Sequence, residues 1–142
     1  MEPLFKTILV PTDFSESATS AVHYAAQLAK KTRAKLVLLH AFYVPDLVTD
    51  VTFMMPSASD LEVTYKNTLK HLKAEIHSTY GKEITVDMIT VKGGPVEEIG
   101  LYMKDHRVDL LIMGMKGASY LDERLFGSAV TKMIHQSTCP VI

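Results

Sequence analysis

Residues 35–42 read KLVLLHAF, an almost unbroken apolar run with the length of one β-strand. A strand that is buried on both faces has this composition, and such strands are typical of parallel sheets that helices cover on both sides. The flanking segments change to a helical period, because apolar residues recur every three or four positions from Ala18 to Ala29 and from Leu61 to Tyr80. The sequence therefore predicts an α/β fold built around this strand.

The alternation of apolar runs and helical periods extends outward from this strand to both ends of the chain. It predicts further strands at residues 7–10, 84–91, 109–113 and 140–142. It predicts helices from Ser15 to Lys31, from Leu61 to Tyr80, from Pro95 onward and from Ser128 to Gln136. This order favours a five-stranded parallel sheet of order 3-2-1-4-5 with helices on both faces, a Rossmann-like architecture.

Local signals mark the ends of the predicted helices. Ser15 suits an N-cap, Pro95 suits a first helical position, and Gly81 suits a left-handed αL terminator. Residues 43–59 contain two prolines and the Met54–Met55 pair, and we expect a long surface loop there.

Composition limits the class of protein. The chain has 142 residues, 47% of them hydrophobic and 22% charged, which fits one globular domain over residues 1–142. A net charge of −1 gives no basic footprint for nucleic acid, and the first apolar run is too short for a signal peptide or a membrane span. The single cysteine, Cys139, rules out an intramolecular disulfide framework, so we expect a cytoplasmic protein. His71 and His77 lie six residues apart on one predicted helix, which does not suit a metal site.

Two predicted loops follow the carboxyl ends of strands, where ligands bind in open α/β sheets. One is Pro11–Ser15, and the other runs from Gly114 to Ser128. They are far apart in sequence, so they meet only if the first and fourth strands are neighbours, as the order 3-2-1-4-5 requires.

The second loop has the more informative spacing, Gly114-x2-Gly117-x9-Gly127-Ser128, with Lys116 between its first two glycines. Glycines let backbone amides approach a phosphate without an intervening Cβ. Gly127 and Ser128 fall at a predicted helix start, where unpaired N–H groups favour anions. The alternative is a tight turn followed by an ordinary serine N-cap.

The chain resembles the ATP-binding branch of the universal stress protein family over nearly its whole length. The resemblance is carried by the opening Ile8–Ser15, the strand end Leu38–His40 and the helix start Gly93–Pro95. The glycine spacing also fits that family's pattern, G-x2-G-x9-G-S/T, at every fixed position. The resemblance implies a fold like that of the adenine nucleotide alpha hydrolases and an adenine nucleotide, ATP or AMP, as the ligand. It leaves open whether Mg²⁺ accompanies ATP.

The resemblance also implies roles for single residues. Asp13 would accept from the ribose hydroxyls or the adenine edge, Pro11 and Thr12 would line that end, and Ala41 and Met113 would flank the base. The groups that would hold the phosphates are Gly114, Lys116, Gly117, Gly127, Ser128 and the backbone amides of Ala129 and Val130. For Asp13 the alternative is a turn-forming residue that binds its own backbone.

The resemblance implies an assembly as well. The family's last strand commonly pairs across a homodimer, but only three residues of that strand are present here. A homodimer and one half of a tandem pair are therefore both expected arrangements, with a protein partner still to be identified.

Three functions remain open on the sequence. The first is a non-enzymatic, nucleotide-responsive module of the stress response. The second is a slow ATPase or phosphotransferase, for which Asp122 and Glu123 are the only candidate bases near the phosphate loop. The third is an interaction protein in which the glycine loop is structural and binds no nucleotide.

Overall fold

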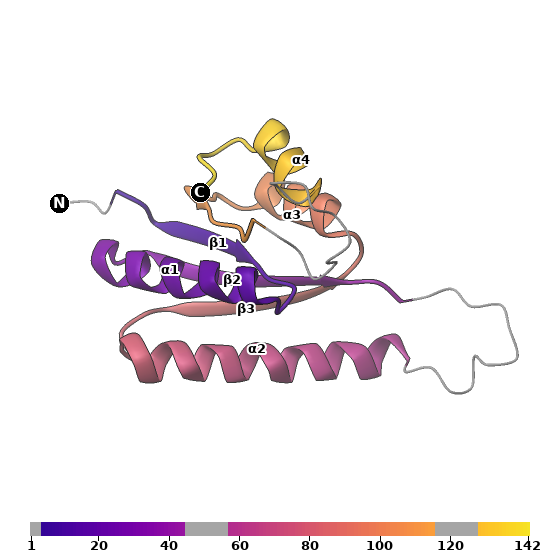
Figure 1. Ribbon diagram of the computed structural model, residues 1–142, viewed down its shortest axis with the longest axis horizontal. Helices are drawn as coiled ribbons and strands as arrows, with labels where there is room; N and C mark the ends of the chain where they lie inside the picture. The colour runs from indigo at the N-terminus through magenta and orange to yellow at the C-terminus, as the bar shows by residue number, and fades with distance from the viewer. Residues whose placement is uncertain (1–3, 45–56, 116–127) are drawn as a thin grey trace, which may run out of the picture.

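The computed structural model describes residues 4–44, 57–115 and 128–142, and within them it shows a parallel sheet between two layers of helices (Figure 1). The strands are β1 (Thr7–Pro11), β2 (Lys35–Phe42), β3 (Val86–Lys92) and β4 (Leu110–Leu111). They form a four-stranded sheet of order β3-β2-β1-β4 in which every neighbouring pair is parallel. The predicted adjacency of the first and fourth strands is therefore confirmed.

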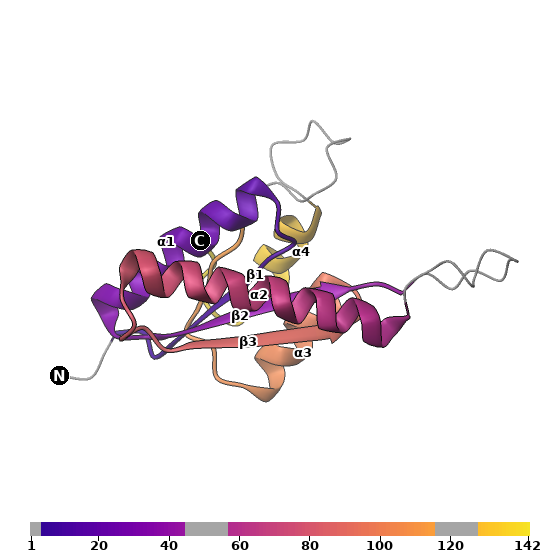
Figure 2. The ribbon, with the colours of Figure 1, turned by 90° about the horizontal axis from the view of Figure 1, so that it is seen from below.

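The helices are α1 (Glu16–Thr32), α2 (Ala58–Tyr80), α3 (Pro95–Asp105) and α4 (Ser128–Gln136). Seen from two directions, α1 and α2 lie on one side of the sheet, and α3 and α4 lie on the other (Figures 1 and 2). None of the helices in the described ranges is both long and apolar enough to cross a membrane.

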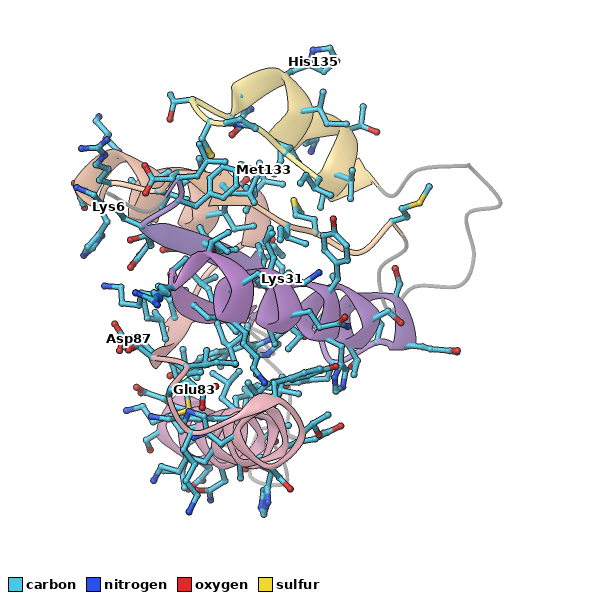
Figure 3. All side chains as sticks on the ribbon, turned by 90° about the vertical axis from the view of Figure 1, so that its left-hand side faces the viewer. Lys6, Lys31, Glu83, Asp87, Met133 and His135 are labelled. Atoms are coloured by element: carbon cyan, nitrogen blue, oxygen red, sulfur yellow. The ribbon has the colours of Figure 1, made fainter. Side chains whose placement is uncertain are left out.

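Alternation along the strands divides the core between these two layers. Ile8, Val10, Leu36 and Leu38 pack with alanines of α1 and with apolar residues of α2, whereas their odd-numbered neighbours pack with α3 and α4. Figure 3 shows the same division on α4, where Met133 points toward the sheet and His135 points away from it. The central strands are thus buried on both faces, which explains their unbroken apolar composition.

The prediction of a fifth strand at residues 140–142 is wrong, because this segment forms an isolated bridge and not a strand. Val141 makes one isolated parallel bridge with Leu111, and the described part of the sheet has four strands. Pro140 has no N–H to donate, so it only accepts from the amide of Leu111 at 3.0 Å, while Ile142 donates to the Leu111 carbonyl at 2.9 Å. The segment nevertheless lies beside β4, the position that the order 3-2-1-4-5 gives it.

The helix boundaries confirm most of the local signals. The Ser15 hydroxyl caps α1 by accepting from the amide of Ala18 at 3.2 Å, and Pro95 occupies the first turn of α3. Gly81 follows α2, but its φ of 126° and ψ of 148° are not the αL conformation that the sequence predicts. The αL residue that ends a helix is instead Arg33, after α1, with φ 58° and ψ 30°.

The predicted loop at residues 43–59 is too long at its carboxyl end. Ser57 caps α2 in a reciprocal capping box with Asp60, so the helix already begins at Ala58. The Met54–Met55 pair lies outside the described residues.

Candidate functional site

Three of the predicted site residues lie at the carboxyl ends of adjacent strands and on one face of the sheet. Leu9, Leu39 and Leu111 belong to the core cluster under α3 and α4. Pro11, Ala41 and Met113 each follow one of these leucines by two positions, so they face the same side. Ala41 and Met113 are half-buried against that cluster. Since α4 begins at Ser128 on this side, the strand ends and the start of α4 border one region.

The loop after β1 is held tightly by its own side chains and by β2. The Thr12 amide donates to the Leu39 carbonyl at 2.8 Å, and the Thr12 hydroxyl accepts from the amide of Phe14 at 3.0 Å. Phe14 adopts a φ of 63°, which a phenylalanine rarely does. Backbone strain of this kind persists only where the surroundings impose it, and it often marks functional loops.

Asp13 has the turn-forming role that the sequence left as an alternative. Its Oδ1 accepts from the amide of Ser15 at 3.0 Å. The residue is nevertheless exposed, beside the buried Thr12, so its carboxylate also faces solvent at the carboxyl edge of the sheet. The turn and a contact with a ligand are therefore compatible roles.

His40 is a buried residue of this region to which the sequence reasoning gave no role. Its Nδ1 lies 2.7 Å from the Thr12 carbonyl oxygen, and the side chain is 7% exposed. Phe14 from the loop, Phe42 from β2 and Tyr65 from α2 surround the imidazole. Burial lowers the pKa of His40, opposed by the Thr12 carbonyl and by the charge of Asp13. The sequence signal that could have identified His40 is its position near the end of the apolar run of β2, where a polar side chain is unusual.

Gly114 has a structural reason to be glycine that differs from the predicted one. A Cβ at this position would lie 2.7 Å from the backbone nitrogen of Ala18 and 2.7 Å from the carbonyl carbon of Ser17. The chain after β4 therefore passes directly against the first turn of α1, and a side chain does not fit between them. The close approach to α1 is a second reason for glycine here, and the predicted contact of Gly114 with a phosphate stays a prediction.

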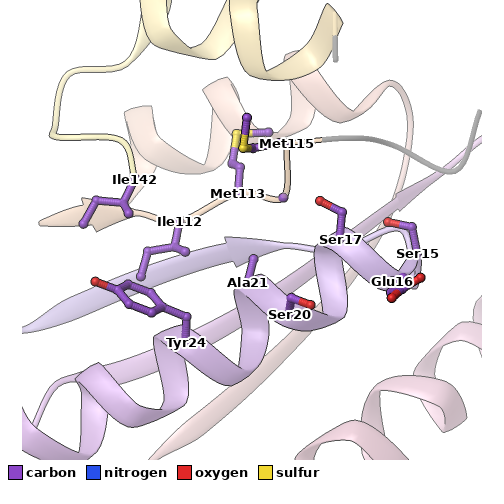
Figure 4. A pocket seen from close by; sticks show the side chains of 11 residues that line it. Ser15, Glu16, Ser17, Ser20, Ala21, Tyr24, Ile112, Met113, Met115 and Ile142 are labelled. Carbon is purple, nitrogen blue, oxygen red and sulfur yellow. The ribbon is translucent and has the colours of Figure 1, made fainter. Parts of the chain in front are cut away.

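A cavity of about 640 Å³ opens beside this contact, between α1 and the end of β4 (Figure 4). Ser17, Ser20 and Tyr24 of α1 line one side of it, and Ile112 and Ile142 line the other. Of the predicted site residues it includes Met113 and Gly114, but not Pro11, Thr12, Asp13 or Ala41. Ile112 belongs to the core layer under α1, so the cavity opens on the α1 side of the sheet, away from α3 and α4.

The remaining predicted residues belong to the glycine loop and to α4. Lys116, Gly117, Gly127 and the candidate bases Asp122 and Glu123 lie outside the described residues. Ser128 is the first residue of α4, Ala129 is half-buried and Val130 is 9% exposed. Within the described ranges, no group of three histidine, cysteine, aspartate or glutamate side chains could hold a metal ion.

Comparison with known proteins gives a consistent result over the whole chain. The sequence profile described as the universal stress protein family matches residues 4–142. Universal stress protein YxiE of Bacillus subtilis is 30% identical over 145 residues, covering 98% of each chain. Universal stress protein MJ0577 of Methanocaldococcus jannaschii is 31% identical over 158 residues, covering 100% of this chain and 96% of that protein.

The solved structures agree with these sequence matches. The structure of MJ0577 superposes with a TM-score of 0.81 at 32% identity, covering 98% of this chain and 94% of that one. A universal stress protein solved in complex with cAMP superposes with a TM-score of 0.71 at 24% identity, covering 97% and 94%. At that lower identity the second likeness concerns the fold alone.

Proposed function

The chain belongs to the universal stress protein family, and from that premise we propose that it binds an adenine nucleotide, ATP or AMP, as a regulatory module of the stress response. The ligand would lie across the carboxyl ends of β1, β2 and β4. Asp13 would contact the ribose or the adenine edge, Pro11 and Thr12 would line that end, and Ala41 and Met113 would flank the base. The phosphates would lie toward the glycine loop and the start of α4.

The observation that carries this proposal is the placement of Pro11, Ala41 and Met113. β1, β2 and β4 are far apart in the sequence, but they bring these residues together at the carboxyl ends of the strands, on the face of the sheet that α3 and α4 cover. Ligands of open α/β sheets bind at such an edge where the chain order reverses, and here β1 lies between β2 and β4. Ser128, the last position of the glycine spacing, begins α4 on the same side, and amides of a first helical turn, which have no partner within the helix, favour an anion.

The test is to release and identify the bound nucleotide, and then to measure its affinity. Protein purified under native conditions is heat-denatured, and the supernatant is analysed by chromatography and mass spectrometry. We expect an adenine nucleotide in near-stoichiometric amount, or, for protein stripped of ligand, a rise in Tm with millimolar AMP or ATP. A ligand at a hundredfold excess over Kd stabilises the folded state by about 2.7 kcal/mol.

A pair of glycine variants makes the test specific. Gly117→Val alters the glycine spacing, and we expect it to abolish the rise in Tm. Gly100→Ala is the matched control, because a Cβ at Gly100, in the interior of α3, meets nothing within 4 Å. If no adenine nucleotide raises the Tm of the unmodified protein, the proposal fails and the interaction protein becomes the better account.

The finer parts of the proposal have their own readouts. ADP that accumulates over hours from loaded ATP would favour the slow ATPase, and repeating the incubation with and without Mg²⁺ tests the metal. Light scattering after size-exclusion chromatography tests the homodimer. Fractionation of cells tests the cytoplasmic location.

A further inference from the structure

We propose that His40 is a positioning residue of the nucleotide site: its Nδ1–H holds the Thr12 carbonyl and so fixes the Thr12–Asp13 segment in the conformation that receives the ligand. This inference rests on the proposed nucleotide function. It adds to that site a residue that holds the loop after β1 from the side of the sheet that α2 covers. This residue does not itself touch the ligand.

Both backbone groups of Thr12 are held by neighbouring residues of β2. The amide donates to the Leu39 carbonyl at 2.8 Å, which continues the pairing of β1 with β2 by one residue. The carbonyl accepts from His40 at 2.7 Å. The peptide plane between Thr12 and Asp13 contains this carbonyl, so the histidine fixes the orientation of the backbone from which the Asp13 side chain departs.

The hydrogen bond defines the state of the imidazole. A carbonyl oxygen only accepts, so Nδ1 carries the proton, and Nε2 of the neutral ring is then an acceptor. Nε2 is buried and makes no hydrogen bond within the described residues. Among the described residues, one other buried side-chain atom has no hydrogen bond. It is Oγ1 of Thr90, the register partner of His40 on β3. The two polar atoms leave the sheet on the same face.

Aromatic neighbours fix the orientation of the ring. The centroid of the His40 ring lies 4.3 Å from that of Tyr65, 4.6 Å from that of Phe14 and 6.4 Å from that of Phe42. These side chains come from α2, from the loop after β1 and from β2, so packing from three elements prevents the imidazole from turning away from Thr12. Burial, which lowers the pKa of His40, favours the neutral ring at pH 7.

The histidine has opposing effects on the stability of the folded state, because its Nδ1–H satisfies the Thr12 carbonyl while its Nε2 has no partner in the described residues. A buried nitrogen without a partner destabilises the folded state, and an apolar side chain of similar size would fill the same space without one. What an apolar residue would lack is the donor to the Thr12 carbonyl. The histidine therefore supplies a backbone-holding donor directly beside the proposed position of the ribose.

The test compares three variants by isothermal titration of AMP. His40→Leu keeps an apolar volume and removes the donor. His40→Asn keeps a donor in the same place, because its amide nitrogen, like Nδ1, is bonded to Cγ. His77→Leu is the matched control, since Nε2 of His77 lies 2.8 Å from the Ile84 carbonyl, before the amino end of β3 and so at the opposite edge of the sheet.

We expect His40→Leu to raise the Kd for AMP about tenfold, the effect of one lost hydrogen bond. His40→Asn should stay within about threefold of the unmodified protein, and His77→Leu should lower the Tm and leave the Kd unchanged. An unchanged Kd in His40→Leu, or equal losses in the leucine and asparagine variants, overturns the positioning role while leaving nucleotide binding intact. If the unmodified protein binds no AMP, the proposed function fails, and the positioning role fails with it.

A spectroscopic measurement applies even if the leucine variant does not fold. In protein labelled with ¹⁵N-histidine, the His40 resonances should show the Nδ1–H tautomer without nucleotide. On saturation with AMP they should shift while those of His77 do not. The Nε2–H tautomer, or His40 resonances that do not shift when AMP is added, would contradict the proposal.

Discussion

Replacing Gly114 by alanine tests whether this glycine serves the fold or the phosphate. The new Cβ would lie 2.7 Å from two backbone atoms of α1, the nitrogen of Ala18 and the carbonyl carbon of Ser17. Carbon atoms in contact are about 3.5 Å apart, so the segment after β4 and the first turn of α1 must separate by about 0.8 Å. Rotation of a side chain cannot relieve the overlap, because the helix backbone is the obstacle. Overpacking of this kind costs about 1–3 kcal/mol.

The assay is thermal unfolding of nucleotide-free protein, followed by the same scan with saturating AMP. For a domain of this size we expect Gly114→Ala to lower the Tm without nucleotide by roughly 3–10 °C. Gly100→Ala, the control with open space around it, should instead stabilise the protein by about 0.5–1 kcal/mol, because alanine favours a helix interior. A nucleotide-free Tm that is unchanged in Gly114→Ala, together with a weaker affinity for AMP, would refute the packing argument and restore the phosphate explanation.

Three further substitutions test local features, each by chemical unfolding. Asp109→Ala should cost about 2–4 kcal/mol, because Oδ2 accepts from the amides of Lys6 and Thr7 at 3.0 Å each. Burial raises the pKa of Asp109, but these amides and Arg107 outweigh burial, so the net effect is a lowered pKa. The stabilisation is therefore present above about pH 4 and is lost as the pH falls below it. Equal acid sensitivity of the variant and the unmodified protein would contradict this. Arg33→Gly should add about 0.5–1 kcal/mol, because glycine adopts αL without strain, and a loss would show that the arginine side chain contributes more. Ser15→Ala should cost about 1 kcal/mol through the lost cap of α1, and an unchanged stability would show that the cap is dispensable.

The order of the sheet could be predicted because its evidence is distributed over the whole chain. β1, β2 and β4 are apolar runs, and the helices have apolar positions at helical spacing, so errors at single residues leave the topology unchanged. The errors occurred where a single residue decides the outcome. Gly81 has a positive φ but not the αL conformation. A glycine in the sequence indicates that a positive φ is tolerated there, but it does not specify which φ and ψ the residue adopts. Val141 forms one bridge instead of a strand, beside Pro140, which has no N–H to donate.

The candidate site was predictable as an edge of the sheet but not as a set of contacts. The strand ends could be placed from the topology, and this places Pro11, Ala41 and Met113 on one face. The role of His40 was not predictable, since an apolar run that ends in histidine does not specify the carbonyl which that histidine contacts. The reason for Gly114 was not predictable either, because it depends on how closely α1 passes, a distance between segments that the sequence does not encode locally.

The strands of this sheet are joined with unequal strength. In the described part of the chain, seven register pairs join β2 to β3 and five join β1 to β2, but only two join β1 to β4. Local opening starts where the pairing is shortest, so we expect the boundary between β1 and β4 to be the seam at which the sheet opens first. A nucleotide that reached from Asp13 to α4 would span this seam and act as a reversible cross-link. Its concentration would then set how often the sheet opens there to a protease or to a partner, with no change in the average shape of the fold.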